Sequence, residues 1–532
     1  MVSLWGSKKD GSHDGERPQT QDGENSDDAG QRHQEPTERS RLLPQQQQQH
    51  HEAYLNPDDP AVSPYNLWTV RATRYLSILF LIITFLWWVL LLVSIFVSPP
   101  GMHSRGSGFF DFSYTTLTLG NLLVGILFFS TPFKAAQISC FIVAILLVVD
   151  MIIILAVGKL RSEEGWVGIA SVVWAVVIAL WTIITDRVVA WGKREEEERL
   201  TGREETRRTL KEWCSVLTAA VVLIVIIIVT ILLTAVLVLR ARDASLPAPG
   251  ERYFVDGDKY EVHIFCEGNL TASNGKRNPT VFLEAGERPV EAGLADFAAN
   301  ALKNGTIDRY CYWDRPGFGW SDNAPSPLSA GMAADSLSEA LARAGEQGPW
   351  ILMSAGIGSV YSRIFSSRHL KEVSGLFLID PLHEDLLHRV GSPGRGFILW
   401  ARGIISPLGF DRLAGALFKG RNREDRVFGD SAYQGGKYLK AKLQENLVAD
   451  SLSRNEVSSA RTIQSKKTPL VIVSSGIETR RDSEWERKQR DLTHLTKKLV
   501  AWDVVNRAPH EVWQTYEGRQ ALEYRLAQLI AR

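Results

Sequence analysis

One turn of this 532-residue chain has the residue pattern of a nucleophilic site but lacks the nucleophile. Residues 350–353 are apolar and predict a buried strand, and the small residues of 354–358 predict a tight turn that leads into a helix. A turn of this kind holds its central residue at a sharp apex, where a serine oxygen would meet a substrate. The central residue here is Gly356, which has no side chain and therefore cannot attack a carbonyl.

A histidine and three carboxylates elsewhere in the chain could supply the acid–base part of the same chemistry. His510 comes late enough to be the general base, and Asp380, Glu478 and Asp482 lie near the ends of predicted strands. A triad also needs a hydroxyl or thiol within hydrogen-bond reach of the imidazole. Ser354 is the alternative nucleophile, but it precedes the apex and should not project as the apex residue does. The pattern therefore predicts a site without serine catalysis.

The segments that would position these residues alternate short β-rich runs with helical stretches, which predicts an α/β sheet. A helix is predicted over 336–344, and the interval 386–465 breaks the alternation as a helical lid would. The strands are predicted at 260–266, 280–283, 309–313, 350–353, 376–380 and 469–474.

The loop after the third of these strands gives the pattern a specific resemblance. Residues 310–322 read Tyr-Cys-Tyr-Trp-Asp-Arg-Pro-Gly-Phe-Gly-Trp-Ser-Asp and resemble the corresponding loop of α/β-hydrolases, one branch of which has Tyr-Asp-Arg-x-Gly-Tyr-Gly-Trp-Ser-Asp. Residues 279–286 and 375–385 resemble the strands before the oxyanion loop and after the apex helix. The resemblance covers about 253–530 and implies an α/β-hydrolase fold with a helical lid within 250–532.

The same resemblance assigns roles to residues of the turn and the loops. The nucleophile position falls on Gly356 and the general base on His510. The oxyanion would be bound by the backbone amides of Ile357 and of a residue in the segment that begins with Gly286 and Glu287. No metal and no cofactor are expected.

Five apolar stretches precede this domain, and each has the roughly 20 residues that a membrane-spanning helix needs. The second is the weakest, and the third contains Asp150, an ionisable residue whose depth in a bilayer would mark it as a functional site. Residues 1–70 are polar, include a glutamine run, and predict a disordered tail. The membrane region occupies 71–242, with spans at about 75–97, 113–133, 135–157, 166–185 and 213–239.

The basic residues of the loops predict an orientation. Arg71, Arg74, Lys134 and the basic cluster of 187–211 fall on one side of five spans, which places the tail in the cytosol and residues 250–532 in the lumen or outside the cell. The prediction inverts if the second span does not exist. A mitochondrial membrane stays an alternative.

Two further features of the C-terminal domain agree with a lumenal location. Asn269 and Asn304 each begin an N-glycosylation sequence. Cys266 and Cys311 are an isolated pair that predicts a disulfide in an exported domain, and the α/β-hydrolase branch named above tends to have cysteines at both positions.

The combined prediction is an integral membrane protein with a non-catalytic α/β-hydrolase-like domain, a pseudoenzyme that binds a small molecule, a lipid or a protein. One alternative is a membrane-bound hydrolase that acts on an ester or lipid through water activated by His510. The other is a transport or scaffold role of the spans that involves Asp150. The 60 basic and 60 acidic residues balance, which gives no reason to expect nucleic acid as a partner.

Overall fold

The computed structural model describes residues 62–129, 131–202, 210–271, 275 and 277–531. Most of the predicted disordered tail therefore lies outside the described residues. Its last part is helical instead, because a short 3-10 turn at Pro64–Asn66 (η2) leads into a helix that begins at Trp68.

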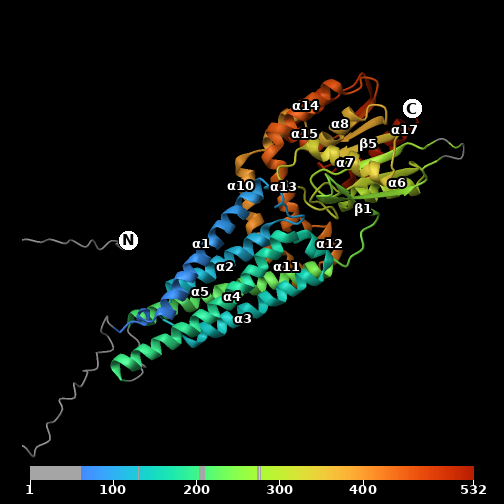
Figure 1. The fold of residues 1–532 in the computed structure, drawn as a ribbon. Coiled ribbons are helices and arrows are strands. Elements are labelled where there is room, and N and C mark those ends of the chain that lie inside the picture. The colour runs from blue at the N-terminus through green and yellow to red at the C-terminus, as the bar shows by residue number, and fades with distance from the viewer. Residues whose placement is uncertain (1–61, 130, 203–209, 272–274, 276, 532) are drawn as a thin grey trace, which may run out of the picture. The chain divides into compact units, whose positions relative to one another are not determined.

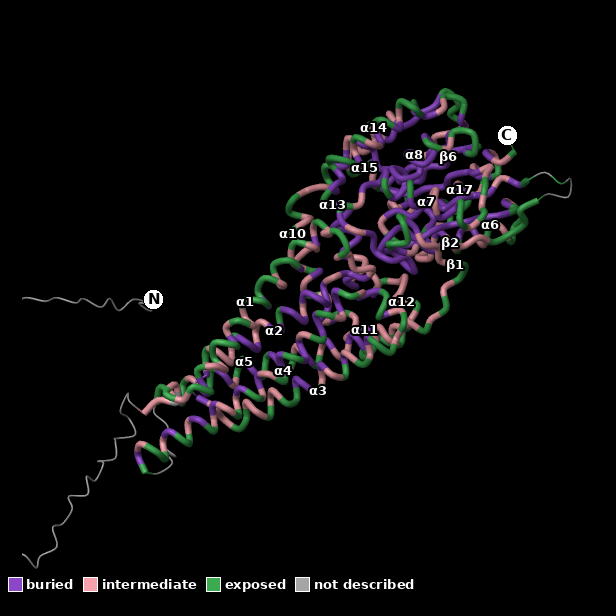
Figure 2. The backbone as a smooth tube through the Cα atoms, viewed as in Figure 1, coloured by how far each residue is buried: buried purple, intermediate pink, exposed green. Residues whose placement is uncertain are grey.

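The predicted membrane region is a bundle of helices that run side by side (Figure 1). Many large apolar side chains on their outer faces are exposed, among them Leu79 and Ile82, and Figure 2 shows these faces in green. Such faces suit contact with lipid, because a soluble protein would bury them. The helices are α1 (Trp68–Phe96), α2 (Phe109–Leu127), α3 (Lys134–Ala156), α4 (Gly158–Thr201) and α5 (Leu210–Asp243).

The prediction of five spans is corrected to four. Helices α1, α3, α4 and α5 are long and apolar enough to cross a membrane, whereas α2 is not. The difference lies in polar side chains on α2, such as Asp111, Thr115 and Asn121, which are buried within the protein. Hydropathy alone cannot distinguish a helix that hides polar groups in a bundle from one that lies outside the membrane.

Helix α2 and the residues that follow it nevertheless connect the two ends of the bundle. At its start, Phe109 lies so close to Gly403 that a Cβ on the glycine would be 2.1 Å from the ring. Beyond its end, Phe129 packs with Val70 and Val189 at the start of α1 and late in α4. The chain therefore passes along the bundle in five helices among the described residues, and α1 begins at the end away from the sheet (Figure 1).

The C-terminal domain contains a mixed sheet in the order β1-β2-β4-β3-β5-β6-β7-β8. Strand β2 pairs antiparallel with both β1 and β4, and the remaining neighbours are parallel. This is the strand order of an α/β-hydrolase-like fold, so the predicted fold class is confirmed. The strands are β1 (Glu251–Val255), β2 (Tyr260–Gly268), β3 (Thr280–Glu284), β4 (Arg309–Trp313), β5 (Trp350–Ala355), β6 (Val373–Ile379), β7 (Pro469–Ser475) and β8 (Lys498–Val505).

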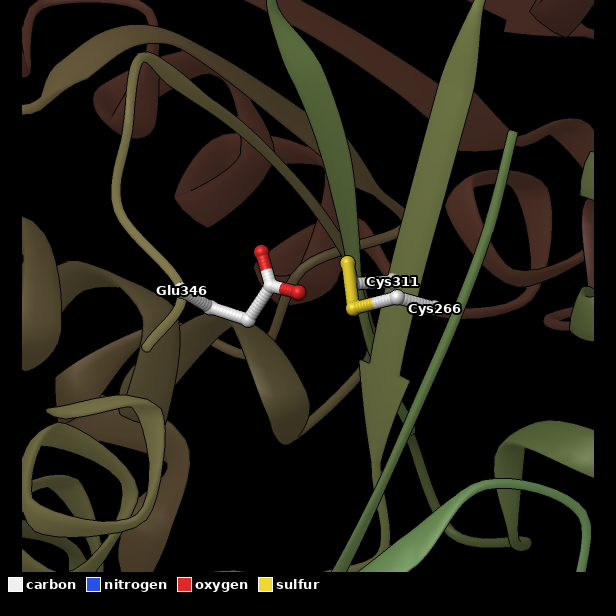
Figure 3. Close-up of side chains that lie close together, drawn as sticks. All are labelled: Cys266, Cys311 and Glu346. Atoms are coloured by element: carbon white, nitrogen blue, oxygen red, sulfur yellow. A yellow bond between two sulfur atoms is a disulfide. The ribbon is translucent and has the colours of Figure 1, made fainter. Parts of the chain in front are cut away.

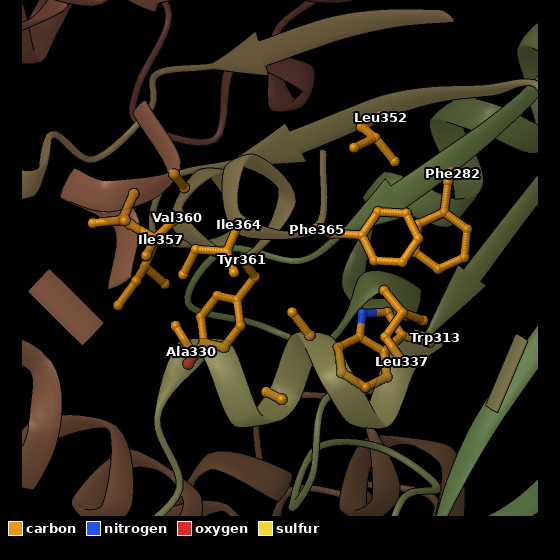
Figure 4. Close-up of a cluster of buried hydrophobic side chains, with 14 of the residues drawn as sticks. Phe282, Trp313, Ala330, Leu337, Leu352, Ile357, Val360, Tyr361, Ile364 and Phe365 are labelled. Carbon is orange, nitrogen blue, oxygen red and sulfur yellow. The ribbon is translucent and has the colours of Figure 1, made fainter. Parts of the chain in front are cut away.

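Helices cover both faces of the sheet and bury its apolar side chains. On one face, α7 (Ala330–Ala344) and α8 (Gly358–Arg368) pack on the strands, and Figure 4 shows Phe282 and Trp313 among the side chains of this cluster. The other face carries α6 (Leu294–Lys303) and α17 (Tyr516–Ile530). Each large apolar side chain buried here contributes about 1.5–3 kcal/mol, so both layers hold the strand ends in fixed positions.

The interval predicted as a lid, 386–465, is helical and touches the bundle. Lys440 donates hydrogen bonds to the carbonyls of Ser94 and Ile95 at the end of α1. The Asn323 amide, from the loop after β4, donates to the carbonyl of Gly106 before α2. The lid helices are α9 (Leu387–Val390), α10 (Pro393–Ile405), α11 (Phe410–Phe418), α12 (Arg423–Val427), α13 (Gly436–Val448) and α14 (Arg454–Ile463).

The predicted disulfide is confirmed. Cys266 of β2 and Cys311 of β4 face each other in the antiparallel register and are joined through their sulfur atoms (Figure 3). The carboxylate of Glu346 lies nearby and forms an ion pair with Arg309 at 2.7 Å. Because both thiols are used in the bond, this group of residues is not available as a metal site.

Candidate functional site

Gly356 occupies the apex between β5 and α8. Its φ is +48°, in the left-handed region that L-residues rarely adopt, and its amide donates to the carbonyl of Ile379 at 3.0 Å. Its own carbonyl accepts from the amide of Leu382 at 2.9 Å. The apex is therefore fixed to the end of β6 in the left-handed conformation that presents a nucleophile in active members of this fold, and glycine adopts it without strain.

His510 and Asp380 form an acid–base pair beside this apex. Nδ1 of His510 lies 2.6 Å from Oδ2 of Asp380, and the aspartate is fully buried. The other carboxylate oxygen, Oδ1, accepts from the amide of Ser475 at 3.1 Å and from the indole of Trp485 at 3.0 Å. Burial lowers the pKa of His510, but the hydrogen bond and charge of Asp380 outweigh it and raise that pKa above its usual value.

The histidine leaves no room for a side chain at the apex. A Cβ built on Gly356 would lie 2.7 Å from Nε2 of His510, closer than real Cβ contacts. The same Cβ would be 3.8 Å from Cα of Gly286 in the oxyanion loop. The imidazole therefore occupies the space in which a serine side chain would begin. A serine at position 356 would require the ring of His510 to move.

The oxyanion residues of the α/β-hydrolase pattern lie around the same point. Ile357 precedes the start of α8, and its side chain is buried in the apolar cluster of Figure 4. The Gly286 carbonyl accepts from Arg315, and the Glu287 carbonyl accepts from the hydroxyl of Tyr438 at 2.7 Å. These bonds fix the loop that would supply the second amide.

Glu287 is held in place through its side chain as well. Burial opposes its charge, but the ammonium of Lys442, at 2.7 Å, outweighs this and lowers the pKa of Glu287 to about 2. The residue is therefore an anchored anion of the loop. The ion pair between this carboxylate and Lys442 had no signal in the sequence.

The alternative nucleophile Ser354 is not brought to the site. It lies within β5, opposite Glu284 of β3, and is fully buried. Its hydroxyl has no hydrogen-bond partner among the residues that the structure describes. Since a triad requires contact between hydroxyl and imidazole, Ser354 does not act with His510 in this arrangement.

The choice among the three carboxylates follows from the fold. Asp380 contacts His510, whereas Asp482 caps α16 (Ser483–Leu492) and forms an ion pair with Arg389 at 2.6 Å. Glu478 belongs to α15 (Gly476–Arg481) beyond β7. The two residues that hold Asp380, Ser475 and Trp485, come from other segments and had no signal in the sequence.

A small cavity adjoins the acid–base pair. It has a volume of about 10 Å³ and is lined by residues that include Gly286, Ala355, His510 and Trp513. This is roughly the space of a single water molecule. Ligand pockets of enzymes usually have about 300–1,000 Å³, so an ester substrate does not fit here in this conformation.

A buried cluster of His263, Glu291 and Asp314 has the residue types of a metal site. Their ligand atoms lie within 4.8 Å of one another, but Nδ1 of His263 is only 2.9 Å from Oδ2 of Asp314. Ligands of a tetrahedral zinc, at bond lengths of about 2.0–2.2 Å, are about 3.3 Å apart. The shorter distance is that of a hydrogen bond between the two side chains. Burial and the charge of Asp314 raise the pKa of Glu291 well above its usual value, which favours the protonated form of this carboxyl group over a metal ligand.

The other predicted residues lie away from this site. Asp150 is fully buried between helices, where it accepts from the hydroxyl of Tyr114 at 3.1 Å. Asn269 and Asn304 are exposed, and the Asn304 amide donates to Glu523 at 2.9 Å. Their glycosylation stays a prediction.

Comparison with known proteins places relatives in two yeasts. An uncharacterized protein of Schizosaccharomyces pombe is 35% identical over 526 residues, which cover 93% of this chain and 96% of that protein. An uncharacterized vacuolar membrane protein of Saccharomyces cerevisiae is 29% identical over 326 residues, 52% of this chain and 50% of that protein. The family model described as "Region of unknown function (DUF2417)" matches residues 38–266.

Solved structures similar to the C-terminal domain include two enzymes. An α/β-hydrolase from a Medee basin deep-sea metagenome library is 12% identical, with a TM-score of 0.38 over 53% of this chain and 98% of its own. The enol-lactonase of Burkholderia xenovorans is 14% identical, with a TM-score of 0.35 over 53% of this chain and 100% of its own. The fold assignment rests on the strand order described above rather than on these scores.

Proposed function

We propose that this chain, which belongs to the same family as the Schizosaccharomyces pombe protein, is an integral membrane protein whose α/β-hydrolase-like domain recognises a ligand without serine catalysis. The fold, the apex and the acid–base pair of a hydrolase are retained. The nucleophile is absent, and the domain therefore serves binding in place of turnover.

One observation carries this proposal. The position of a serine Cβ at residue 356 is only 2.7 Å from Nε2 of His510, so the base occupies the space that the nucleophile would need. A loss of serine alone would leave a gap, which a bound water or a substrate group could fill. Here the gap is closed by the histidine itself.

Activity-based labelling tests the proposal directly. Purified full-length protein is treated with a fluorophosphonate probe and with short-chain nitrophenyl esters, alongside Ser354→Ala and His510→Ala. We expect no labelling and no turnover above the His510→Ala background. Labelling that disappears in Ser354→Ala would mean that β5 rearranges to present this serine, and the proposal would be wrong.

A second candidate function is hydrolysis by an activated water. The side chain of His510 is 34% exposed and keeps its aspartate, and the adjoining cavity has room for about one water. A neutral imidazole could accept a proton from that water. Ester turnover that is lost in His510→Ala but unchanged in Ser354→Ala would establish this candidate over the first.

We infer further that the protein resides in an endomembrane with its tail in the cytosol and its C-terminal domain in the lumen. The vacuolar membrane assignment of the Saccharomyces cerevisiae relative favours an endomembrane over a mitochondrial membrane. Four spans alone would place both ends of the chain on the same side of the membrane. Because α2 also passes from one end of the bundle to the other, we infer that the two ends lie on opposite sides. The disulfide Cys266–Cys311 agrees with an oxidising lumen.

A further inference from the structure

A cavity lined in part by charged side chains lies where the bundle meets the lid, apart from the acid–base pair. It has a volume of about 100 Å³ and shares only Pro289 with the lining of the small cavity beside His510. Its walls come from the loop before α2, the start of α4, the end of α5, the loop after β4 and the lid helices. The space suits several waters, or a phosphate group with its adjoining atoms.

Cations outnumber carboxylates in the lining of this cavity. Two of the cations are neutralised by acidic residues of the bundle. Arg240 pairs with Glu163 at 2.8 Å and with Glu164 at 2.6 Å. Arg426 contacts both oxygens of Asp243 at 2.6–3.0 Å. The full set of charged lining residues is Lys159, Glu163, Arg240, Asp243, Arg412, Arg426 and Lys437.

The other three cations have no carboxylate of their own. Arg412 reaches only the Asp243 that Arg426 already binds, at 3.4 Å, and its Nε has no hydrogen-bond partner among the described residues. Lys437 donates to the carbonyl of Gly319 at 2.8 Å. Lys159 lies 5.2 Å from the ring centre of Trp320.

The pKa values of the two lid cations are lowered mainly by their burial. Burial, followed by the neighbouring arginines Arg240 and Arg426, lowers the pKa of Arg412 to about 10 despite the attraction of Asp243. Burial lowers the pKa of Lys437 to about 8 despite the attraction of Glu163, and nearby Lys159 lowers it further. A bound anion would offset both effects, because it would attract the protonated forms.

The cavity also lies at the level expected for lipid head groups. The apolar run of α5 ends where Arg240 begins the cavity wall, and the apolar run of α4 starts at Trp166, just after Glu163. Trp166 is 56% exposed and donates to the carbonyl of Gly101. Tryptophans of this kind gather at membrane–water interfaces, where the phosphates of lipid head groups lie.

We propose that Arg412, Lys437 and Lys159 bind a phosphate-bearing anion, and that its source is the head group of an acidic phospholipid. The guanidinium of Arg412 would contact phosphate oxygens, and the two ammonium groups would add charge. The inference rests on the ligand-binding role proposed above and names the ligand class.

Native mass spectrometry of the detergent-solubilised full-length protein tests this inference. Phosphatidic acid and phosphatidylcholine are added in parallel, and retained lipid is compared among wild type, Arg412→Gln and Lys437→Gln. We expect wild type to retain phosphatidic acid over phosphatidylcholine, and each variant to lose about tenfold or more of that retention. Arg490→Gln is the matched control, because this arginine is 65% exposed on α16.

The thermal unfolding of the same proteins in inorganic phosphate identifies the source. If phosphate raises the Tm of wild type but not of the two cavity variants, while lipids are not distinguished, the anion is soluble. Equal retention of both lipids, with no effect of phosphate, would overturn the proposal, as would cavity variants that fold and bind like wild type. Hydrolase turnover is measured independently, so catalysis at His510 would refute the non-catalytic assignment while leaving this test intact.

Discussion

Replacing Gly356 with alanine should destabilise the protein. At a site whose backbone conformation alanine can adopt, the same change increases the free energy of unfolding by about 0.4–1 kcal/mol, because the unfolded chain becomes less flexible. At Gly356 the φ of +48° belongs to the left-handed region, which costs an L-residue about 1–2 kcal/mol. The cost of the backbone conformation alone therefore makes the substitution destabilising.

The contact with His510 adds to that cost. The new Cβ would be 2.7 Å from Nε2, so the ring must retreat and weaken its bond to Asp380. A hydrogen bond to a charged group contributes about 1.5–3 kcal/mol, which we reduce to about 1 kcal/mol because the imidazole is partly exposed. After the gain of about 0.4–1 kcal/mol from the unfolded chain is subtracted, the net loss is about 1–2.5 kcal/mol, or roughly 2–5 °C in Tm.

Gly345 provides the matched control for this measurement. It ends α7 with a φ of +72°, and a Cβ there would meet no described atom within 4 Å. Gly345→Ala therefore carries the backbone cost alone, and the difference from Gly356→Ala isolates the contact with His510. Thermal unfolding followed by circular dichroism gives both values. Equal stability of the two variants would refute the reasoning that the histidine fills the apex.

Gly356→Ser separates the steric effect from the chemistry. It has the same Cβ, but its hydroxyl can bond to the displaced imidazole and recover about 1 kcal/mol relative to alanine. Displacement of the imidazole would also widen the cavity of about 10 Å³ that excludes a substrate, so we expect this variant to react with a fluorophosphonate and to lose that reaction when His510→Ala is added. Labelling that persists without His510 would contradict the role of the pair as base.

The acid–base pair, the disulfide and the glycosylation sequences give three more tests. Burial lowers the pKa of His510, but the hydrogen bond and charge of Asp380 raise it above its value in the unfolded chain. The pair therefore stabilises the folded protein fully at pH values below the unfolded-state pKa of about 6.5. This stabilisation is lost as the pH rises through the folded-state pKa. The Tm advantage over His510→Gln should shrink as the pH rises above about 6.5 and through the raised folded-state pKa, and an advantage that grows would count against the pair. Replacing Cys266 and Cys311 by alanine removes a disulfide that closes a loop of 45 residues, and the free energy of unfolding in denaturant should fall by about 4 kcal/mol. An unchanged denaturation midpoint would refute this stabilising role of the disulfide. Asn269→Gln should remove part of a glycosidase-sensitive gel shift in yeast-expressed protein, and wild type without any shift would contradict the lumenal location.

The apex was predictable because its signals are local. Residues 350–358 form a strand, a turn and a helix start in direct succession, so the position of Gly356 needed no knowledge of the rest of the fold. The acid was not predictable in this way. Asp380, Glu478 and Asp482 all follow strands, and only the packing of β6 between β5 and β7 brings the first of them to His510.

Other features escaped sequence reasoning for physical reasons. The edge strands β1 and β8 are half-exposed and lack the continuous apolar runs of the inner strands. The polar residues of α2 are buried within the bundle, so hydropathy could not show whether this segment crosses the membrane. The basic cavity combines residues as distant as Lys159 and Lys437, and no contiguous motif could have indicated it.

The hydrogen bonds from Lys440 to the end of α1 have a consequence for how the protein can be handled. The amino group of Lys440, in the lid, is buried and donates hydrogen bonds to two of the last carbonyls of α1. A soluble fragment that starts at residue 250 would therefore lose these hydrogen bonds and expose the apolar surface that Phe109 covers at Gly403. The two regions depend on each other for solubility and folding, so biochemistry on this protein requires the whole chain in detergent or lipid.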